Sequence, residues 1–312
     1  MAQQTTSCIL MVSPDSFSYN PQTAGSNSFQ NKPEFEPKTL RKKAIEEFGG
    51  MTKKLTGEGI DVLVLSNDTE IDVPDAVFPN NWFATYEEGT IMLFPMLSEN
   101  RRLERSKDTI TEVMESSGYS IKRFVDYSEY EKQGLILEGT GSLVLDRKND
   151  AVYAIESERT SRILFDRYCD EMKIPSGNRI FFHANDENGD PIYHTNVIMS
   201  IGSGFAVICS ECIESSERKN VLEKLRSSGL EVIDITYSQL KNFCGNILNV
   251  KNVKGESLIV LSASAMWNFE ERQIEALQKY GRLVEVSINT IESVGGGSAR
   301  CMMAEIFLPK AP

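Results

Sequence analysis

Residues 142–182 read SLVLDRKNDAVYAIESERTSRILFDRYCDEMKIPSGNRIFF and contain one complete unit of the pattern that decides the fold. The sequence predicts two short strands, a helix and another strand, at 142–145, 152–155, 159–172 and 179–182. The polar run Asp-Arg-Lys-Asn-Asp between the first two strands suits a tight hairpin turn. Apolar residues at helical spacing, followed closely by an apolar run, are typical of a surface helix that leads into a buried strand. The unit is therefore strand, strand, helix, strand.

The same unit recurs along the chain at intervals of roughly 45 to 60 residues, which is the range of known repeat architectures. Helix and strand pairs are expected at 40–55 with 60–65, 99–116 with 120–125, 216–227 with 230–235, and 269–279 with 283–288. Further short strands are expected at 90–94, 197–200 and 205–208. Five such units fill the chain, and nothing between them resembles a linker. We therefore expect an α/β fold that forms one pseudo-symmetric domain over residues 1–312.

A doubly wound parallel sheet is the alternative for a chain in which helices and strands alternate. The hairpin in each unit argues against this alternative, because a doubly wound sheet is built from parallel strands. The sequence also lacks the Gly-x-Gly-x-x-Gly turn that joins a strand to a helix in dinucleotide-binding folds. The run Gly295-Gly296-Gly297 is expected to precede a strand rather than a helix.

Charge and composition narrow the class of partner. The 312 residues include 33 Lys plus Arg and 45 Asp plus Glu, which gives a net charge of −12 and an isoelectric point near 4.9. A field of this sign repels nucleic-acid backbones and anionic lipid surfaces. No apolar run approaches the roughly 18 residues that a membrane-spanning helix needs, and the first residues do not resemble a secretion signal. We therefore expect a cytoplasmic protein whose six cysteines are free thiols.

One cysteine stands in a conspicuous setting near the C-terminus, in the run Gly-Gly-Gly-Ser-Ala-Arg-Cys at 295–301. The glycines would let backbone amides approach a ligand, and we expect a flexible loop that delivers Cys301 to the start of the last strand. Arg300 and those amides would lower the pKa of the thiol from about 8.5 toward neutrality, which suits a nucleophile. The alternative is a buried cysteine that packs as a small apolar side chain.

A cysteine nucleophile needs a group that transfers protons, and the sequence offers His183 and His194. His194 is the better candidate, because it is expected to enter an apolar strand with Asn196 two places on, on the same face. Either histidine could instead be a structural residue. Glu138 follows an apolar run and precedes two glycines, where it would either be half desolvated, with a raised pKa, or only cap a turn.

An amide-rich turn follows the segment Pro74-Asp75-Ala76-Val77-Phe78. In it, Asn80 and Asn81 stand directly before Trp82. Tandem asparagines are common in turns, because Asn tolerates the left-handed backbone conformation. On local sequence alone, the two amides are therefore compatible with a purely structural turn.

Taken in this order, the elements around Asp75, Glu138, His194 and Cys301 resemble those of the guanidino-group-modifying superfamily. That superfamily contains amidinotransferases, arginine deiminases and dimethylarginine hydrolases, and the chain is most similar to its branch of citrulline-utilising hydrolases. The resemblance spans essentially the whole chain and implies a five-bladed α/β propeller of strand-strand-helix-strand repeats. It also implies that Cys301 is the nucleophile, His194 the general acid and base, and Glu138 the carboxylate that orients the substrate and holds His194.

The departures from the superfamily's pattern indicate the substrate. Asn80 and Asn81 stand where arginine-processing relatives carry an acidic residue, and Asn196 stands where deiminases often have Asp. Loss of such carboxylates removes charge-assisted hydrogen bonds, each worth roughly 1.5 to 3 kcal/mol to a bound cation. An amide both donates and accepts, so it suits a neutral ureido group. The predicted reaction is therefore the hydrolysis of citrulline to ornithine, carbon dioxide and ammonia through an S-carbamoyl-cysteine intermediate.

The remaining expectations concern the substrate contacts, the partners and the alternatives. The residues expected to contact the substrate are Asp75, Asn80, Asn81, Asn196 and Arg300. We expect a small amino-acid substrate and no metal, organic cofactor, nucleic acid or membrane partner, and a homodimer is left open. An amidinotransferase or an arginine-type deiminase that uses the same cysteine is the alternative reaction. A non-catalytic binding protein with the same fold is the further alternative.

Overall fold

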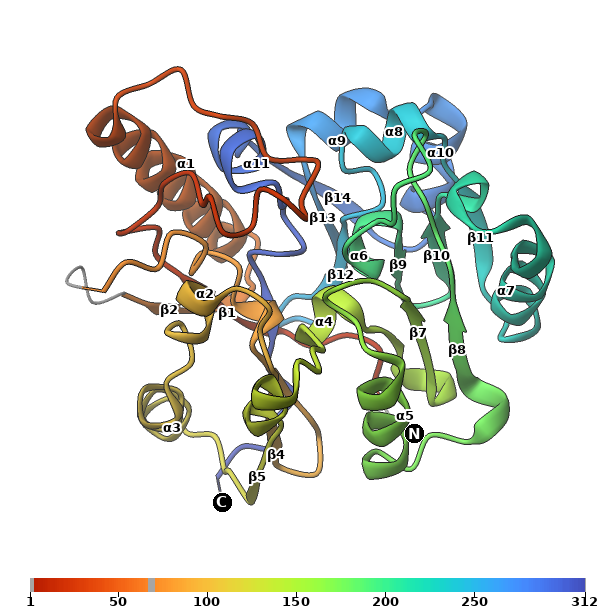
Figure 1. Ribbon diagram of the computed structural model, residues 1–312, viewed down its shortest axis with the longest axis horizontal. Coiled ribbons are helices and arrows are strands. Elements are labelled where there is room, and N and C mark those ends of the chain that lie inside the picture. The colour runs from red at the N-terminus through yellow and green to blue at the C-terminus, as the bar shows by residue number, and fades with distance from the viewer. Residues whose placement is uncertain (1–2, 67–70, 312) are drawn as a thin grey trace.

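The computed structural model describes residues 3–66 and 71–311, and the strands of these residues form five three-stranded sheets (Figure 1). The sheets contain β1 (Cys8–Val12), β2 (Asp61–Leu65) and β15 (Ala304–Glu305); β3 (Phe83–Thr85), β4 (Thr90–Leu93) and β5 (Arg123–Asp126); β6 (Val144–Asp146), β7 (Ala151–Ile155) and β8 (Arg179–Phe182); β9 (Met199–Ile201), β10 (Phe205–Ile208) and β11 (Glu231–Asp234); and β12 (Leu248–Lys251), β13 (Ser257–Ser262) and β14 (Arg282–Val286). In each sheet the middle strand pairs antiparallel with one neighbour and parallel with the other. The predicted five-bladed α/β propeller is confirmed, and the doubly wound parallel sheet is excluded.

Helices connect the two parallel strands of each blade, because parallel neighbours need a crossover rather than a tight turn. These crossovers contain α1 (Pro37–Gly57), α3 (Lys107–Ser116), α5 (Arg162–Glu171), α7 (Ser215–Ser227), and α9 (Ala263–Asn268) with α10 (Glu271–Gln278). Figure 1 shows these helices around the outside of the molecule. In four of the five blades the hairpin and the crossover together reproduce the order that the sequence predicts for each unit.

The middle strands are buried on both faces. All five residues of β7 are buried, as are all five of β1, which is the pattern of strands covered by a helix on one side and by a neighbouring blade on the other. On α1 the buried residues recur every three or four positions and end with Phe48, Met51 and Leu55. The crossover helices therefore turn an apolar stripe toward the sheets and a charged face outward.

The ring closes through a strand from near the end of the described chain. In β15, Glu305 pairs with Ile9 and Ala304 pairs with Leu10, antiparallel to β1. The first blade therefore takes its antiparallel strand from the opposite end of the sequence, whereas the other four blades take theirs from a local hairpin or a short connection. This closure fixes residues 295–303, which lead into β15.

Two predicted elements differ from the structure. The helix expected at 99–116 is divided into α2 (Glu99–Arg102) and α3, because the buried side chain of Arg101 turns inward to Glu104, 2.9 Å away, and Ser106 caps a new helix start. The strand expected from 197 begins only at Met199, after the short helix α6 (Thr195–Ile198). No helix within residues 3–66 and 71–311 is long and apolar enough to cross a membrane.

Candidate active site

The turn before the first strand of each blade contributes one polar residue to a shared site. Asn81 precedes β3, Glu138 precedes β6, His194 precedes β9, Asn246 precedes β12 and Cys301 precedes β15. The short helices α4 (Gly139–Ser142) and α6, which follow Glu138 and His194, lie near the centre of the ring in Figure 1. Pseudo-symmetry therefore brings together five residues that are far apart in the sequence.

His194 and Glu138 form a buried hydrogen-bonded pair. Nε2 of His194 lies 2.8 Å from Oε2 of Glu138, and the two side chains are 2% and 0% exposed. The other oxygen of Glu138 accepts a hydrogen bond from the backbone N–H of Leu97 at 3.0 Å. Arg159 adds a guanidinium 3.5 Å from the shared carboxylate oxygen. His194 lies at the start of α6 rather than on a strand, so the expected strand geometry with Asn196 is wrong.

In the pair of His194 and Glu138, a neutral imidazole lies beside an ionised carboxylate. Burial lowers the pKa of His194 to about 4, which outweighs the opposite effect of Glu138. Burial alone would raise the pKa of Glu138, but Arg159 and the hydrogen bond from His194 hold it well below its usual range. The alternative of a half-desolvated Glu138 with a raised pKa is therefore wrong, and its side chain caps no helix.

Two glycines after Glu138 allow this close packing. A Cβ atom added to Gly141 would lie 2.5 Å from Nδ2 of Asn81 and 2.7 Å from Cε1 of His194. Gly139 has a φ of +46°, and a Cβ atom there would lie 2.4 Å from the backbone oxygen of Asn80. The sequence Glu-Gly-Thr-Gly at 138–141 is thus explained by the space that His194 and Asn81 occupy.

Cys301 lies in a tight turn after the helix α11 (Asn289–Gly295), so the glycine run ends a helix instead of only preceding a strand. Gly296 has the left-handed conformation, with a φ of +67°, and its backbone oxygen accepts hydrogen bonds from Tyr193 at 2.6 Å and Asn27 at 3.2 Å. The thiol is 4% exposed, and its Sγ atom is 3.3 Å from Nδ2 of Asn246. The loop is held in place on both sides.

The pKa of the Cys301 thiol is raised, contrary to the expectation from the sequence. Burial is the largest cause, and it outweighs the lowering effects of the backbone at Ser298, of Asn246 and of Arg300. Free Cys301 is therefore a thiol near neutral pH, and His194 beside the same cavity is uncharged.

A narrow cavity of about 10 Å³ opens onto Cys301 and His194. Its other walls come from Asn27, Asp75, Phe78, Asn81, Arg101, Arg159, Tyr193 and Gly295–Gly297. Arg101 and Arg159, each less than 3% exposed, bring two guanidinium groups to this cavity. Sequence reasoning missed both arginines, because isolated charged residues in a helical or polar stretch resemble solvent-exposed ones.

Asp75 and Asn81 lie in the cavity wall. Oδ2 of Asp75 accepts hydrogen bonds from Asn20 at 2.7 Å and Thr23 at 3.1 Å, whereas Oδ1 is buried with no partner in the described part of the chain. Burial raises the pKa of this carboxyl, against the lowering effect of Arg101. The amide oxygen of Asn81 accepts from Nη1 of Arg101 at 2.8 Å. Asp75 therefore keeps one oxygen free for a ligand.

Three residues expected to contact the substrate do not line this cavity. The amide of Asn80 bonds to Thr140 and Asn81. Asn196 lies behind the thiol, with Nδ2 3.6 Å from Sγ of Cys301. Arg300 donates to the backbone oxygen of Met303 at 2.8 Å and to Glu305 at 2.9 Å, in the wall of a separate cavity.

The second histidine lies apart from the site. His183 is 55% exposed on its side chain and sits between Glu156 and Glu217, at 2.8 and 3.1 Å. Within residues 3–66 and 71–311, no group of three or more His, Cys, Asp or Glu side chains is placed to hold a metal ion.

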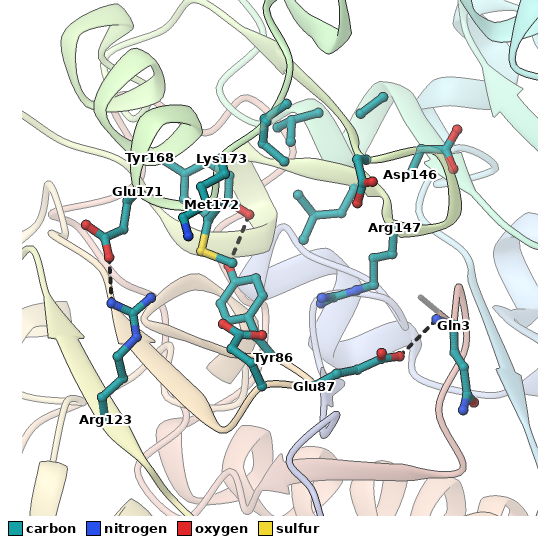
Figure 2. A pocket seen from close by; sticks show the side chains of 16 residues that line it. Gln3, Tyr86, Glu87, Arg123, Asp146, Arg147, Tyr168, Glu171, Met172 and Lys173 are labelled. Atoms are coloured by element: carbon teal, nitrogen blue, oxygen red, sulfur yellow. Dashed lines mark hydrogen bonds and ion pairs between the residues drawn. The ribbon is translucent and has the colours of Figure 1, made fainter. Parts of the chain in front are cut away.

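A larger cavity, of about 320 Å³, lies elsewhere, between the β3–β4 turn and α5 (Figure 2). Its charged walls are partly paired, since Arg123 lies 2.7 Å from Glu171 and Glu87 accepts from the backbone of Gln3. None of the cysteines or histidines lines it among the described residues. Size therefore does not identify the reactive site, whereas the grouping of thiol, imidazole and carboxylate does.

A five-bladed propeller with Cys, His and Glu gathered at its centre defines an enzyme of the guanidino-group-modifying superfamily. The chain belongs to the family described as N,N dimethylarginine dimethylhydrolase, eukaryotic, which matches residues 13–308. It is a cysteine-dependent guanidino-group hydrolase that acts on C–N bonds other than peptide bonds. No curated protein matches the sequence.

Solved structures support the same fold at low sequence identity. The N-terminal domain of ArgZ, an arginine dihydrolase from cyanobacteria crystallised with its substrate, is 16% identical, with a TM-score of 0.72 over 96% of this chain and 99% of that one. The dimethylarginine hydrolase from Pseudomonas aeruginosa, in complex with citrulline, is 15% identical, with a TM-score of 0.63 over 98% and 99%. These similarities establish the architecture and leave the substrate open.

Proposed function

We propose that the chain hydrolyses citrulline to ornithine, carbon dioxide and ammonia, with Cys301 as the nucleophile. The observation that carries this proposal is the pair of buried guanidinium groups, Arg101 and Arg159, in the wall of the cavity that contains the thiol. Glu104 lies 2.9 Å from Arg101 and Glu138 lies 3.5 Å from Arg159, so both carboxylates are already paired. A substrate guanidinium would enter as a third cation with only Asp75, whose pKa burial raises, to offset it. A ureido group is neutral and needs no such partner.

The same arginines suit the other end of an amino-acid substrate, because a guanidinium binds a carboxylate with both charge and directed hydrogen bonds. Arg159 is held in position by Ser26 and Thr23, which accept hydrogen bonds at 2.7 and 3.3 Å. Such prior fixing reduces the side-chain entropy that is lost when a ligand binds. The free oxygen of Asp75 is available to an N–H of the ureido group.

The first half of the reaction forms a thioester-like adduct. Sγ of Cys301 attacks the ureido carbon while its proton passes to His194, which has a neutral ring and no partner for Nδ1 among the described residues. Glu138 stabilises the imidazolium through the 2.8 Å contact with Nε2. His194 then returns the proton to the departing amine, the C–N bond breaks, and ornithine leaves an S-carbamoyl group on Cys301.

The second half consumes water. His194 removes a proton from a water molecule that attacks the carbamoyl carbon, and the C–S bond breaks as the sulfur regains its proton. Carbamate is released and decays to carbon dioxide and ammonia. One citrulline and one water thus give ornithine, carbon dioxide and ammonia.

Arginine is the second candidate substrate, and one observation favours it. The unpartnered oxygen of Asp75 is an ionisable acceptor, and a carboxylate accepts more strongly from a guanidinium than from a ureido group. An arginine-type deiminase or an amidinotransferase would use the same thiol but a different adduct: an S-alkylthiouronium when ammonia leaves arginine first, or an S-amidino group when the amine leaves first.

The test is a panel of citrulline, arginine, agmatine and methylated arginines, each assayed for ornithine, citrulline and ammonia with and without glycine as an amine acceptor. The proposal expects kcat/KM for citrulline to exceed that for arginine by at least about tenfold, equivalent to roughly 1.4 kcal/mol. A preference for arginine, or transfer to glycine in place of hydrolysis, would overturn it.

A further inference from the structure

Asn246 contacts the sulfur of Cys301 from the blade of β12, which contributes no residue to the proposed reaction steps. It lies in the turn before β12, where the backbone N–H of Asn246 donates to the oxygen of Phe243 at 2.9 Å. A Cβ atom on the preceding Gly245 would lie 2.3 Å from the backbone oxygen of Val197. The turn is therefore pressed against α6, and this packing directs the amide of Asn246 toward Cys301.

The orientation of the Asn246 amide follows from its neighbours. One of its two terminal atoms lies 2.8 Å from the backbone oxygen of Asn196, and a backbone oxygen can only accept. That atom must be the nitrogen, which has two hydrogens. The same Nδ2 lies 3.3 Å from Sγ of Cys301, so its second hydrogen points to the sulfur. The amide oxygen, 3.6 Å from Sγ, is placed to accept from the thiol when the sulfur is protonated.

Asn196 adds a second amide on the same side of the sulfur. Its Nδ2 is 3.6 Å from Sγ, and its Oδ1 is buried with no partner in the ranges that the structure describes. Neither asparagine is among the residues that line the cavity at Cys301. The two amides therefore touch the reacting atom without touching the place where substrate binds.

We propose that Asn246, assisted by Asn196, is a catalytic residue that stabilises the thiolate of Cys301 by hydrogen bonds from its side-chain amide. The inference rests on the proposed role of Cys301 as nucleophile. Negative charge develops on the sulfur twice in each turnover, first as the thiol loses its proton during attack and again as the C–S bond to the carbamoyl carbon breaks. Each N–H contact to a developing anion in a buried site lowers both barriers.

The groups that set the charge around Sγ are known, so the contribution of Asn246 can be isolated. The charged or titratable side chains around the thiol are Asp75, Arg101, Glu138, Arg159, Tyr193, His194, Glu292 and Arg300. All of them remain in a variant of Asn246, and burial of the thiol, the main cause of its raised pKa, also remains.

The test compares Asn246→Leu and Asn246→Asp with wild type. Asp has the shape of Asn but replaces the donor with an anion, whereas Leu removes the donor without adding charge. We expect iodoacetamide to alkylate Cys301 at pH 8.5 at least about threefold more slowly in the Leu variant and at least about tenfold more slowly in the Asp variant. Peptide mass spectrometry assigns the label to Cys301 rather than to another cysteine. We also expect kcat to fall at least about tenfold in both variants, with KM changed by less than about twofold.

The matched control is Asn249→Leu, which removes a buried amide on β12 that bonds to Ser257 and Leu258 and does not contact the sulfur. Its alkylation rate should equal that of wild type at the same degree of folding, which thermal unfolding checks.

A purely structural role for Asn246 predicts a smaller loss of alkylation rate in the Asp variant than in the Leu variant, and this result would overturn the proposal. If the Leu variant does not fold, the Asp variant alone decides, because an unchanged alkylation rate in it excludes a donor role. If the substrate panel shows no hydrolysis of citrulline, the proposed substrate is refuted. Slower alkylation in the Asn246 variants would still support the role of Asn246 in that case.

Discussion

Nε2 of His194 lies 2.8 Å from Oε2 of Glu138, and both side chains are almost entirely buried. This contact joins two blades of the propeller and fixes the ring of His194, so that Nδ1 is left for proton transfer. It also ties the protonation of the site to the stability of the fold, because both groups ionise differently in the folded and unfolded chain.

The contribution of His194 to the free energy of unfolding should decrease as the pH falls from about 6.5 to about 4, whereas Glu104, whose pKa burial raises to about 7, contributes in the opposite direction. Unfolded His194 takes up a proton near pH 6.5, whereas folded His194 takes one up only near pH 4, so the stabilising effect is complete above 6.5 and is lost through that window. At about 1.4 kcal/mol per pKa unit, the full effect is roughly 3 kcal/mol. Urea unfolding across this range should show that wild type loses more stability on acidification than His194→Gln, and this difference isolates the contribution of His194. His183→Gln should show a steeper loss on acidification, because Glu217 and Glu156 raise the pKa of His183 and its protonation therefore stabilises the folded chain. An equal slope in wild type and His194→Gln would refute the burial effect.

Cys301→Ser should reduce turnover at least about a thousandfold. A serine hydroxyl is scarcely ionised near neutral pH, and proton transfer to His194 does not make its oxygen as nucleophilic as the cysteine sulfur. The measurement is ornithine release, together with intact-protein mass during turnover, where wild type should show a carbamoyl adduct. The variant should unfold at a similar temperature, since the change is a single atom. Ordinary turnover by this variant would end the covalent mechanism.

His194→Ala should lose most activity, and His183→Ala should retain nearly all of it. His194 shares the cavity with the thiol, whereas His183 is half exposed between Glu156 and Glu217. Steady-state kinetics of the two variants under the same conditions provide the comparison. Comparable losses in both would mean that His183 has a role that its position does not explain.

Asn81→Asp should shift the ratio of kcat/KM for citrulline to that for arginine toward arginine by at least about tenfold, because it adds an anion to the cavity wall beside Arg101. Asn80→Asp is the control, since the amide of Asn80 lies outside that wall. An unchanged ratio in Asn81→Asp would show that this position does not set the charge preference.

Gly141→Ala should lower kcat by at least about tenfold, because the new methyl group meets both Asn81 and His194 and moves the imidazole within the cavity that it shares with the thiol. Gly177→Ala, where an added Cβ atom has no neighbour within 4 Å, should behave as wild type. Full activity in Gly141→Ala would show that the turn can retreat without moving His194.

The blade order was predictable because each unit repeats the same local signals. The helical spacing before 179–182 and the Asp-Arg-Lys-Asn-Asp turn both correspond to structure in the third blade. Cys301, His194 and Glu138 stood out because their neighbours were unusual for apolar strands and loops, and the structure brings all three together.

Other features depend on tertiary packing that no local pattern records. Burial reverses the expected pKa of the Cys301 thiol, although the glycines and Arg300 that suggested a low value are present. Arg101 and Arg159 became visible only when the fold placed them against the same cavity. The local sequence around Asn246 does not predict a role for it, because its contact with the sulfur of Cys301 joins two blades that are distant in the sequence.

Because β15 pairs with β1, the first blade cannot form until nearly all of the described chain has left the ribosome. Until then β1 offers an open edge that other strands could join, so a nascent chain is a candidate for chaperone protection. Cys301 emerges just before the strand that closes the ring. Synthesis therefore delivers the reactive sulfur together with the strand that completes its surroundings, and an interrupted translation product would carry neither.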